Sequence, residues 1–308
     1  MSNAKSQKII LITGATAGIG RATALYLAHK GHHVIATGRK VAELVKLRAE
    51  AGALRLDTVA LDVTSQGSIA AAVAEVDRLT GDHGVDVLVN NAGYGALGPS
   101  SEITDAEMRR QYETNVFGLM NVTRAFLPKM RERKAGRIVN VSSVGGRITL
   151  PFFGVYNSTK YAVESLSDAL RYELRAWNID VTLIEPGVIR TNFEATAINN
   201  LDQFSQSAYA PAMAKVDELS KKFDRFASDP IVIAKAIARA VRARRAPARI
   251  VAPRSTSFIL FMSAVLPTRM WDWSMRKMGY LSKKALAITP SVPVAAPIAK
   301  PAPALHAN

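Results

Sequence analysis

The sequence contains no cysteine and, near its start, no long apolar run. Without thiols the chain can form neither disulfides nor zinc–thiolate sites and has no cysteine nucleophile, which fits a reducing compartment. The polar start "MSNAKSQ" is followed only by the short apolar run "IILIT" at residues 9–13, so it does not resemble a secretory signal. We therefore expect a cytoplasmic protein.

Acidic residues are also scarce. Only 25 Asp and Glu stand against 40 Lys and Arg, which gives a formal net charge of +15. Residues 221–284 carry +12 of this charge, whereas residues 1–220 carry only +2. A basic segment can attract nucleic acid or an anionic membrane, but no recognised nucleic-acid-binding motif accompanies the charge. We therefore predict no nucleic-acid partner.

What is present is an alternation of short β-branched segments with longer segments rich in alanine and leucine. We expect strands at residues 9–13, 33–37, 57–61, 85–90, 136–143, 180–186 and 248–252. Helices are expected between them, including residues 18–30, 66–80, 104–133, 156–178 and 230–244. Strands separated by helices form right-handed βαβ units. The sequence therefore predicts an α/β fold with a doubly wound (Rossmann) parallel sheet in a single catalytic domain, residues 8–252.

The segment "TGATAGIG" at residues 13–20 directly follows the first expected strand. In a strand-to-helix turn, glycines permit a tight backbone, and a pyrophosphate can meet the free amides at the helix N-terminus. The expected dinucleotide contacts in this turn are Gly14, Thr16, Gly18, Ile19 and Gly20.

The end of the second strand indicates which dinucleotide binds. NAD-binding proteins carry an acidic residue about 20 residues after the loop, where this chain has Gly38 followed by Arg39. A guanidinium suits a 2′-phosphate, so the pattern favours NADP(H) over NAD(H). The alternative is that Arg39 and Lys40 only cap an exposed strand end.

Tyr156 and Lys160 lie four residues apart in "VYNSTKYAVE". Residues at this spacing share one helix face, so both side chains can reach a site at the carboxyl ends of the strands. A neighbouring ammonium lowers the pKa of a phenol from its ordinary value of about 10. We therefore expect Tyr156 to give a proton to a carbonyl oxygen while a nicotinamide delivers hydride to the carbon. Helix packing is the alternative.

Further motifs follow in order along the chain: Asp62 in "LDVT", "NNAG" at 90–93, Asn115 in "TNVFG", Ser143 thirteen residues before Tyr156, and "PGVIRT" at 186–191. Together with the glycine loop and the Tyr-x3-Lys pair, they make about residues 8–252 resemble the short-chain dehydrogenase/reductase family. The resemblance is to NADP-preferring members of the hydroxysteroid and retinol dehydrogenase kind, with a C-terminal extension.

The resemblance implies a role for each matched residue. The catalytic residues would be Asn115, Ser143, Tyr156 and Lys160. Ser143, rather than its neighbour Ser142, would polarise the substrate oxygen, Lys160 would also hold the nicotinamide ribose, and Asn115 would fix a water in a proton relay. A purely structural role is the alternative for Asn115. The further cofactor contacts would be Asp62, Val63, Asn90, Ala92, Gly93, Pro186, Gly187, Val188 and Thr191.

The substrate must be inferred from the variable segments. Residues 192–225 are too long for a plain connection and are expected to form a lid. Apolar contacts are expected from the lid residues Phe193, Leu201, Phe204 and Tyr209 and from Tyr94, Leu97, Val144, Phe152 and Phe153 beside the catalytic motifs. They indicate a lipophilic ketone, aldehyde or alcohol. The alternative is that these aromatic residues pack the lid against the body.

Residues 253–288 form an apolar and basic extension. The run "SFILFMSAVLP" at 257–267 is too short to span a bilayer, and "TRMWDWSMRKMGYLSKK" after it mixes aromatic with basic residues. We expect a helical hairpin that contacts anionic lipid or receives a lipophilic substrate; packing on the protein's own body or on a second subunit is the alternative. The Pro/Ala-rich residues 289–308 are expected to be disordered.

Three functions are compatible with these motifs. The leading one is an NADP(H)-dependent oxidoreductase acting on a lipophilic carbonyl or alcohol; a 3-oxoacyl-(acyl carrier) reductase and a non-catalytic NADP-sensing protein are the alternatives. By analogy with the family we expect a homodimer or homotetramer built on the helices at 104–133 and 156–178. No metal is expected, because Gly31 separates His29 from His33 and no third ligand is evident.

Overall fold

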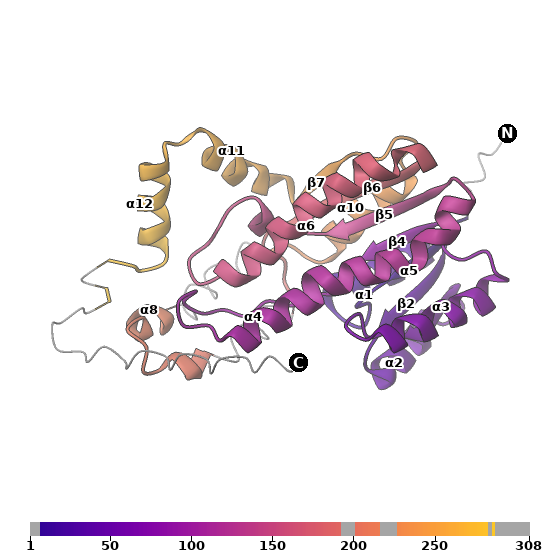
Figure 1. Cartoon of the computed structure of the whole chain (residues 1–308), viewed down its shortest axis with the longest axis horizontal. Coiled ribbons are helices and arrows are strands. Elements are labelled where there is room, and N and C mark those ends of the chain that lie inside the picture. Colours follow the sequence, from indigo (N-terminus) through magenta and orange to yellow (C-terminus); the bar gives the residue numbers. More distant parts are fainter. Residues whose placement is uncertain (1–6, 192–200, 216–226, 283–284, 287–308) are drawn as a thin grey trace, which may run out of the picture.

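The computed structural model describes residues 7–191, 201–215, 227–282 and 285–286. Within this part of the chain, seven parallel strands form one sheet in the order β3-β2-β1-β4-β5-β6-β7 (Figure 1). The strands are β1 (Ile9–Ile12), β2 (His33–Gly38), β3 (Leu56–Ala60), β4 (Val87–Asn90), β5 (Gly136–Val141), β6 (Ile179–Pro186) and β7 (Arg249–Ala252). The strand order reverses between β1 and β4, where an α/β sheet binds its ligand. The predicted doubly wound parallel sheet is confirmed.

Helices cover both faces of the sheet. Those that bound it are α1 (Gly18–His29), α2 (Val41–Ala51), α3 (Gln66–Thr80), α4 (Asp105–Tyr112), α5 (Leu119–Glu132), α6 (Gly154–Glu173) and α10 (Ile231–Arg242). Ile10 and Ile12 of β1 pack with α1, α2 and α10 on one face, while Leu11 packs with α3, α5 and α6 on the other. Successive residues of a strand point to opposite faces, so a continuous apolar run is what a sheet covered on both sides requires.

The expected strands all occur, and their ends differ from the expected ones by at most two residues. Helix α2 was not among the expected helical segments. The single helix expected at residues 104–133 is interrupted by a π-helical turn, η1 (Glu113–Gly118), between α4 and α5. A Cβ atom on Gly118 would lie 2.8 Å from Cγ2 of Val63, so the turn brings this backbone tightly against the loop after β3. Such turns within helices are frequent at functional sites.

Two parts of the chain lie outside the sheet and its helices. Of the predicted lid, the structure describes residues 201–215, which contain η4 (Leu201–Phe204) and α8 (Ala210–Met213). After β7, the chain forms η5 (Arg254–Thr256), α11 (Ser257–Val265) and α12 (Thr268–Met278). We call residues 254–278 the C-terminal arm; Figure 1 shows α11 and α12 projecting beyond the sheet, with α12 turned across the direction of α11.

The predicted extension is therefore helical over most of its described length. Phe193 of the predicted lid and the predicted disordered tail, residues 289–308, lie outside the described residues. None of the helices in the described ranges is long and apolar enough to cross a membrane.

Candidate active site

A cavity of about 510 Å³ opens at the carboxyl ends of the central strands, and the glycine loop between β1 and α1 forms one of its walls. Gly14, Thr16, Gly18 and Ile19 line this wall, so the N-terminus of α1 borders the cavity. Gly20 does not line it. A Cβ atom on Gly20 would lie 2.3 Å from the carbonyl oxygen of Gly14, so glycine is required there for the loop to fold back on the helix.

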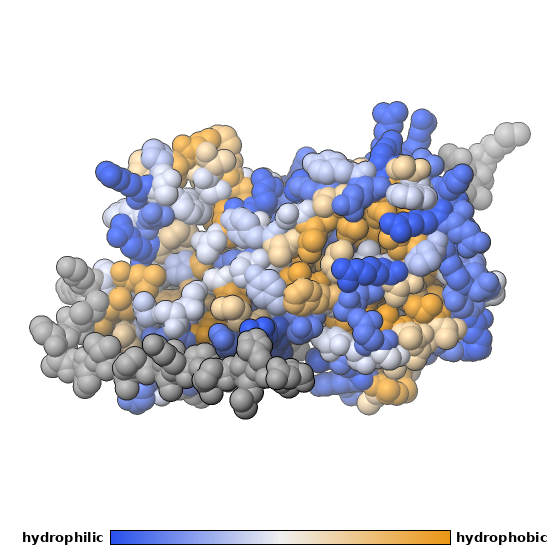
Figure 2. All heavy atoms as spheres, in the orientation of Figure 1, coloured by the Kyte–Doolittle hydropathy of each residue, from blue (hydrophilic) through white to orange (hydrophobic). Residues whose placement is uncertain are grey.

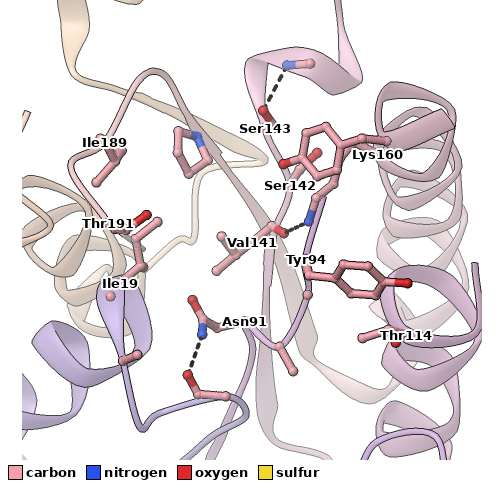
Figure 3. A pocket seen from close by; sticks show the side chains of 18 of the residues that line it. Ile19, Asn91, Tyr94, Thr114, Val141, Ser142, Ser143, Lys160, Ile189 and Thr191 are labelled. Carbon is pink, nitrogen blue, oxygen red and sulfur yellow. Dashed lines mark hydrogen bonds between the residues drawn. The ribbon is translucent and has the colours of Figure 1, made fainter. Parts of the chain in front are cut away.

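Asn91, which the sequence analysis missed, fixes the glycine loop from the end of β4. Its Nδ2 donates hydrogen bonds to the carbonyl oxygens of Thr13 and Gly14, at 2.9 and 3.1 Å. Asn91 lines the cavity together with Ala92 and Gly93 (Figure 3). These bonds hold the glycine loop against the end of β4.

Asn90 is not beside the cofactor cavity, which corrects the sequence-based prediction. Its side chain is buried in the protein interior, where Nδ2 donates to Thr123 Oγ1 and to Asn140 Oδ1, both at 2.9 Å. Asn90 is the last residue of β4, so its side chain follows the alternation of the strand, whereas Asn91 stands beyond the strand end. This alternation was the available signal for choosing between the two.

The predicted adenosine end of the cavity is formed by the residues that follow β2 and β3. Arg39, Asp62 and Val63 line it as expected, and Leu61 and Thr64 were missed. Burial opposes ionisation of Asp62, but hydrogen bonds from Thr64 N and Oγ1 and the charge of Arg39 hold the pKa of Asp62 below its usual value. Thr64 thus bonds to one oxygen of the carboxylate, while Arg39 lines the cavity. These residues fit a dinucleotide that carries a 2′-phosphate.

The loop after β6 forms the wall across the cavity from α6. Pro186, Gly187, Val188 and Thr191 line it as predicted, together with Ile189. A Cβ atom on Gly18 would lie 3.2 Å from Cγ2 of Thr191, so this loop closes over the start of α1. In Figure 3, Ile19, Ile189 and Thr191 face Tyr94, Thr114 and Lys160 across the cavity.

Tyr156, Lys160 and Ser143 meet at the cavity wall between β5 and α6. The hydroxyls of Tyr156 and Ser143 share a hydrogen bond, and Ser143 Oγ also accepts one from Gly145 N at 3.0 Å. Lys160 Nζ donates to the carbonyl oxygen of Val141 at 2.9 Å and lies 5.8 Å from the centroid of the Tyr156 ring. The side chain of Ser142 turns instead toward Glu164, so the structure brings Ser143 and not Ser142 to the tyrosine.

The expected lowering of the tyrosine pKa by Lys160 is wrong for this site. Burial raises the pKa of Tyr156 to about 12, against the smaller opposing effect of its hydrogen bond with Ser143. Burial likewise lowers the pKa of Lys160 to about 8, and the charge of Glu164 acts in the opposite direction. Desolvation of the phenolate is therefore the main influence on the pKa of Tyr156, and the Lys160 ammonium is not among its causes. Tyr156 is consequently a neutral phenol near pH 7, which is the form that can donate a proton.

Asn115 lies in the π-helical turn and is buried, but it does not line the cavity. Its Oδ1 accepts from Tyr94 N at 3.0 Å, and its Nδ2 donates to Tyr94 O at 2.8 Å and to Thr159 Oγ1 at 3.1 Å. Both ends of the amide are thus occupied by the protein's own groups. Its side chain positions the Tyr94 backbone and α6, as the structural alternative expects, and the role of Asn115 in a proton relay stays a prediction.

Residues 8–202 match the family described as short chain dehydrogenase. The chain belongs to the short-chain dehydrogenase family. It is therefore an oxidoreductase, as the glycine loop and the Tyr-x3-Lys pair led us to expect.

Similar short-chain dehydrogenases include a 3-ketodihydrosphingosine reductase of Bacteroides thetaiotaomicron, 34% identical over 272 residues that cover 87% of this chain and 97% of the relative. An NADPH-dependent 3-dehydrocapnine reductase of Ornithobacterium rhinotracheale is 33% identical over 85% of this chain and 94% of its own. Among solved structures, the closed form of a serine dehydrogenase with NADP+ aligns with a TM-score of 0.69 and 29% identity, over 79% of this chain and 93% of its own. The names of the 3-dehydrocapnine reductase and of the serine dehydrogenase structure include NADPH and NADP+, which agrees with the expected preference for NADP.

The remaining wall of the short-chain dehydrogenase cavity is largely apolar. Tyr94, Leu97, Val144 and Phe153 line it as expected, and Leu150 and Asn157 were missed. The Tyr94 hydroxyl donates to Glu107 Oε1 at 3.2 Å and accepts from Arg110 Nε at 3.1 Å, so the ring is held at the cavity wall by two charged side chains.

Phe152 and Phe204 do not line the cavity, which corrects their assignment to the substrate site. They are buried in a cluster with Leu97, Ala212 and Met213. Phe152 stacks edge-on against Tyr209, with ring centroids 6.2 Å apart, and a Cβ atom on Gly98 would lie 2.5 Å from Cζ of Phe204. Phe204 and Tyr209 of the lid thus pack against Phe152 and Leu97 of the body, as the alternative interpretation proposed.

The structure gives no sign of a metal centre in its described ranges, where no group of three His, Asp or Glu side chains is placed to hold an ion. His33, at the start of β2, is instead bonded through Nε2 to Asp57 Oδ2 at 2.7 Å.

Proposed function

We propose that this protein is an NADP(H)-dependent oxidoreductase that interconverts a lipophilic ketone or aldehyde and its alcohol. The observation that carries the proposal is the meeting of Ser143, Tyr156 and Lys160 at a cavity whose other end holds Arg39. The names of two relatives, a 3-ketodihydrosphingosine reductase and an NADPH-dependent 3-dehydrocapnine reductase, support reduction of a ketone.

The cofactor would lie along the strand ends. The glycine loop and the N-terminus of α1 would hold its pyrophosphate, and Arg39 its 2′-phosphate. Asp62 and Val63 would border the adenine, while Pro186, Val188 and Thr191 would contact the nicotinamide. When bound, the cofactor supplies the hydride that adds to the carbonyl carbon.

The protein's own residues would supply and stabilise the proton. The Ser143 hydroxyl would donate a hydrogen bond to the carbonyl oxygen, and the Tyr156 phenol would transfer its proton to that oxygen as it gains negative charge. The tyrosine is left as a phenolate, which the Lys160 ammonium stabilises. One hydride and one proton convert the ketone to the alcohol, and the reverse reaction requires Tyr156 to accept the proton again.

The cavity wall around the reacting carbon supports a lipophilic substrate. Leu97, Val144, Leu150 and Phe153 provide apolar surface there, while the charged lining residues Arg39, Asp62 and Lys160 belong to the cofactor and catalytic ends. An apolar wall favours a hydrocarbon chain or ring by desolvating it.

We further propose a homodimer or homotetramer that uses the helices around α5 and α6. Phe117 in the π-helical turn and Tyr161 on α6 leave 51% and 43% of their surface exposed. Apolar side chains exposed on two neighbouring helices suit contact with a second copy.

The direct test is oxidation of NADPH by purified protein with lipophilic ketones, aldehydes and acyl thioesters, and with the Tyr156→Phe variant in parallel. We expect turnover of a lipophilic ketone or aldehyde and a fall in kcat of about 100- to 10,000-fold in the variant, because the proton donor is lost. Tyr161→Phe is the matched control, since it removes a hydroxyl from the same helix outside the cavity. NADPH binding, followed by its fluorescence, should be retained in both.

Two outcomes would contradict the proposal. NADPH binding without turnover of any compound would favour the NADP-sensing alternative, and activity on acyl thioesters alone would favour the 3-oxoacyl-(acyl carrier) reductase. Full activity in Tyr156→Phe would exclude the tyrosine as proton donor.

A further inference from the structure

Helix α11 of the C-terminal arm carries no charge and buries none of its residues. Phe258, Phe261 and Val265 expose 69%, 60% and 55% of their surface. They lie at positions i, i+3 and i+7, so they share one face of the helix. Figure 2 shows hydrophobic residues gathered on the part of the molecule where Figure 1 places α11.

Helix α12 adds basic groups to aromatic ones. Met270 and Trp273 expose 56% and 60% of their surface, and Lys277 Nζ lies 5.2 Å from the centroid of the Trp273 ring. Across residues 254–278, the basic side chains Arg254, Arg269, Arg276 and Lys277 stand against the single acid Asp272. Tryptophan with lysine and arginine beside an apolar helix is the combination found at the boundary between lipid headgroups and acyl chains.

A hollow beneath α12 strengthens the electrostatic argument. It lies between the arm and the body and is lined by Pro151, Arg269, Asp272, Met275, Arg276 and Leu281. Two guanidinium groups outnumber the one carboxylate in it, and guanidinium groups pair bidentately with phosphate oxygens. The hollow therefore suits the phosphate of a lipid headgroup.

Both ends of the arm rest on the rim of the active-site cavity. At its start, Thr256 packs closely on Gly187, which lines the cavity: a Cβ atom on Gly187 would lie 2.3 Å from Thr256 Oγ1. Just beyond its end, Gly279 packs on Pro151, next to the cavity-lining Leu150, and Leu281 packs against the cluster that contains Leu97. A surface that binds the arm would therefore lie close to the active-site cavity.

We propose that the C-terminal arm docks the protein on an anionic lipid surface, with α11 among the acyl chains and α12 at the headgroups. The charge favours lipid over a second copy of the arm, because a twofold contact between two copies would bring like charges together. Helix α11 has nine residues, which at about 1.5 Å each is far shorter than a bilayer core, so it lies in the interface. A second part of the proposal, that the cavity takes its lipophilic substrate from this surface, rests on the proposed function.

The test is flotation of the full chain with vesicles of phosphatidylcholine, alone and with about one third phosphatidylglycerol. We expect binding to the anionic vesicles only, weakened by high salt. Phe258→Glu with Phe261→Glu should lower the partition onto these vesicles at least about tenfold. Val41→Glu with Val45→Glu is the matched control, because these residues of α2 expose 61% each and the variant makes the same charge change away from the arm.

Docking would be overturned if the wild-type protein failed to bind anionic vesicles or if the arm variant bound them as well as the control variant. A smaller oligomer in the arm variant, without vesicle binding by the wild type, would assign the arm to a second copy instead. Binding is read without catalysis, so its failure is separate from that of the proposed function. If both hold, the arm variant should lose turnover of a ketone lipid presented in vesicles and keep turnover of a short, water-soluble ketone.

Discussion

The two ends of the active-site cavity are built in different ways. The cofactor end consists of strand termini and tight loops, where glycines and short polar side chains such as Thr13 and Asn91 fix the backbone through hydrogen bonds. The substrate end consists of side chains from loops far apart in the sequence, such as Leu97 and Phe153, supported by the buried aromatic cluster of the lid.

Because the two ends are built differently, substitutions at the cofactor end and at the substrate end should have different consequences. At the cofactor end, a side chain contacts a ligand group of fixed charge and position. A substitution there should therefore weaken the binding of one cofactor, NADPH or NADH, and leave the binding of the other unchanged. At the substrate end, neighbouring aromatics divide into those that line the cavity and those that hold the lid. Substitutions there should separate into effects on substrate binding and effects on stability.

Among substitutions that compare the two ends, the largest effect is expected from Arg39→Ala. Loss of a guanidinium from a 2′-phosphate removes a charge-assisted hydrogen bond, which is worth about 1.5 to 3 kcal/mol. We therefore expect the KM for NADPH to rise about 10- to 100-fold while the KM for NADH changes little, measured with one ketone and both cofactors. Lys40→Ala is the control, since Lys40 neighbours Arg39 in sequence but does not line the cavity. Equal losses with both cofactors would place Arg39 elsewhere than at the 2′-phosphate.

At the substrate end, Phe153→Ala and Phe152→Ala should have different effects, the first on substrate binding and the second on stability. Phe153 lines the cavity, so its loss should raise the KM of a lipophilic ketone about tenfold, as removal of about 1.5 kcal/mol of apolar contact predicts. Phe152 is buried in the lid cluster, so its loss should lower Tm and leave the KM of a small ketone close to the wild-type value. The measurements are substrate kinetics and thermal unfolding of both variants. Similar KM changes in the two variants would show that the lid cluster and the cavity wall act as one unit.

The same contrast explains what the sequence could predict. The strands were found because a sheet buried on both faces demands continuous apolar runs such as "IILI", and the glycine loop because its backbone has no room for a Cβ atom at Gly20. Ser143, Tyr156 and Lys160 follow from spacing on one strand end and one helix. These features are local in the chain, so a short stretch of sequence carries the whole signal.

The errors lie where the outcome depends on distant contacts. Phe152 and Phe153 are adjacent and chemically identical, yet Phe152, with a backbone φ of 66°, is buried within the lid cluster, whereas Phe153 lines the cavity and packs against that cluster only in part. The hydrogen bonds of the Asn115 amide to Tyr94 and Thr159 were likewise not predictable, because no motif around Asn115 reveals them. The tyrosine pKa was misjudged because sequence spacing shows the neighbouring charge but not the depth of burial.

The smallest effect is expected at Lys160, which lies between the two ends of the cavity, and it concerns the pH dependence of the reaction. Burial lowers the pKa of Lys160 to about 8, and Glu164, one turn further along α6, raises it. The lysine is charged below this pKa, so reduction should slow as the pH rises past about 8, while Tyr156, with a pKa of about 12, keeps its proton. Glu164→Gln removes the opposing charge, so the decline should begin at a lower pH.

The measurement is the pH profile of ketone reduction for the wild type, Glu164→Gln and the control Glu173→Gln, an exposed carboxylate near the end of the same helix. Glu164 also pairs with Arg249, whose Nε lies 3.1 Å from Glu164 Oε2, so Tm is recorded alongside. A loss of stability with an unmoved profile would mean that Glu164 only supports the packing of α6 on β7. A profile that moves in Glu164→Gln and not in Glu173→Gln would show that the charge behind the catalytic lysine sets the pH range in which the two ends of the cavity work together.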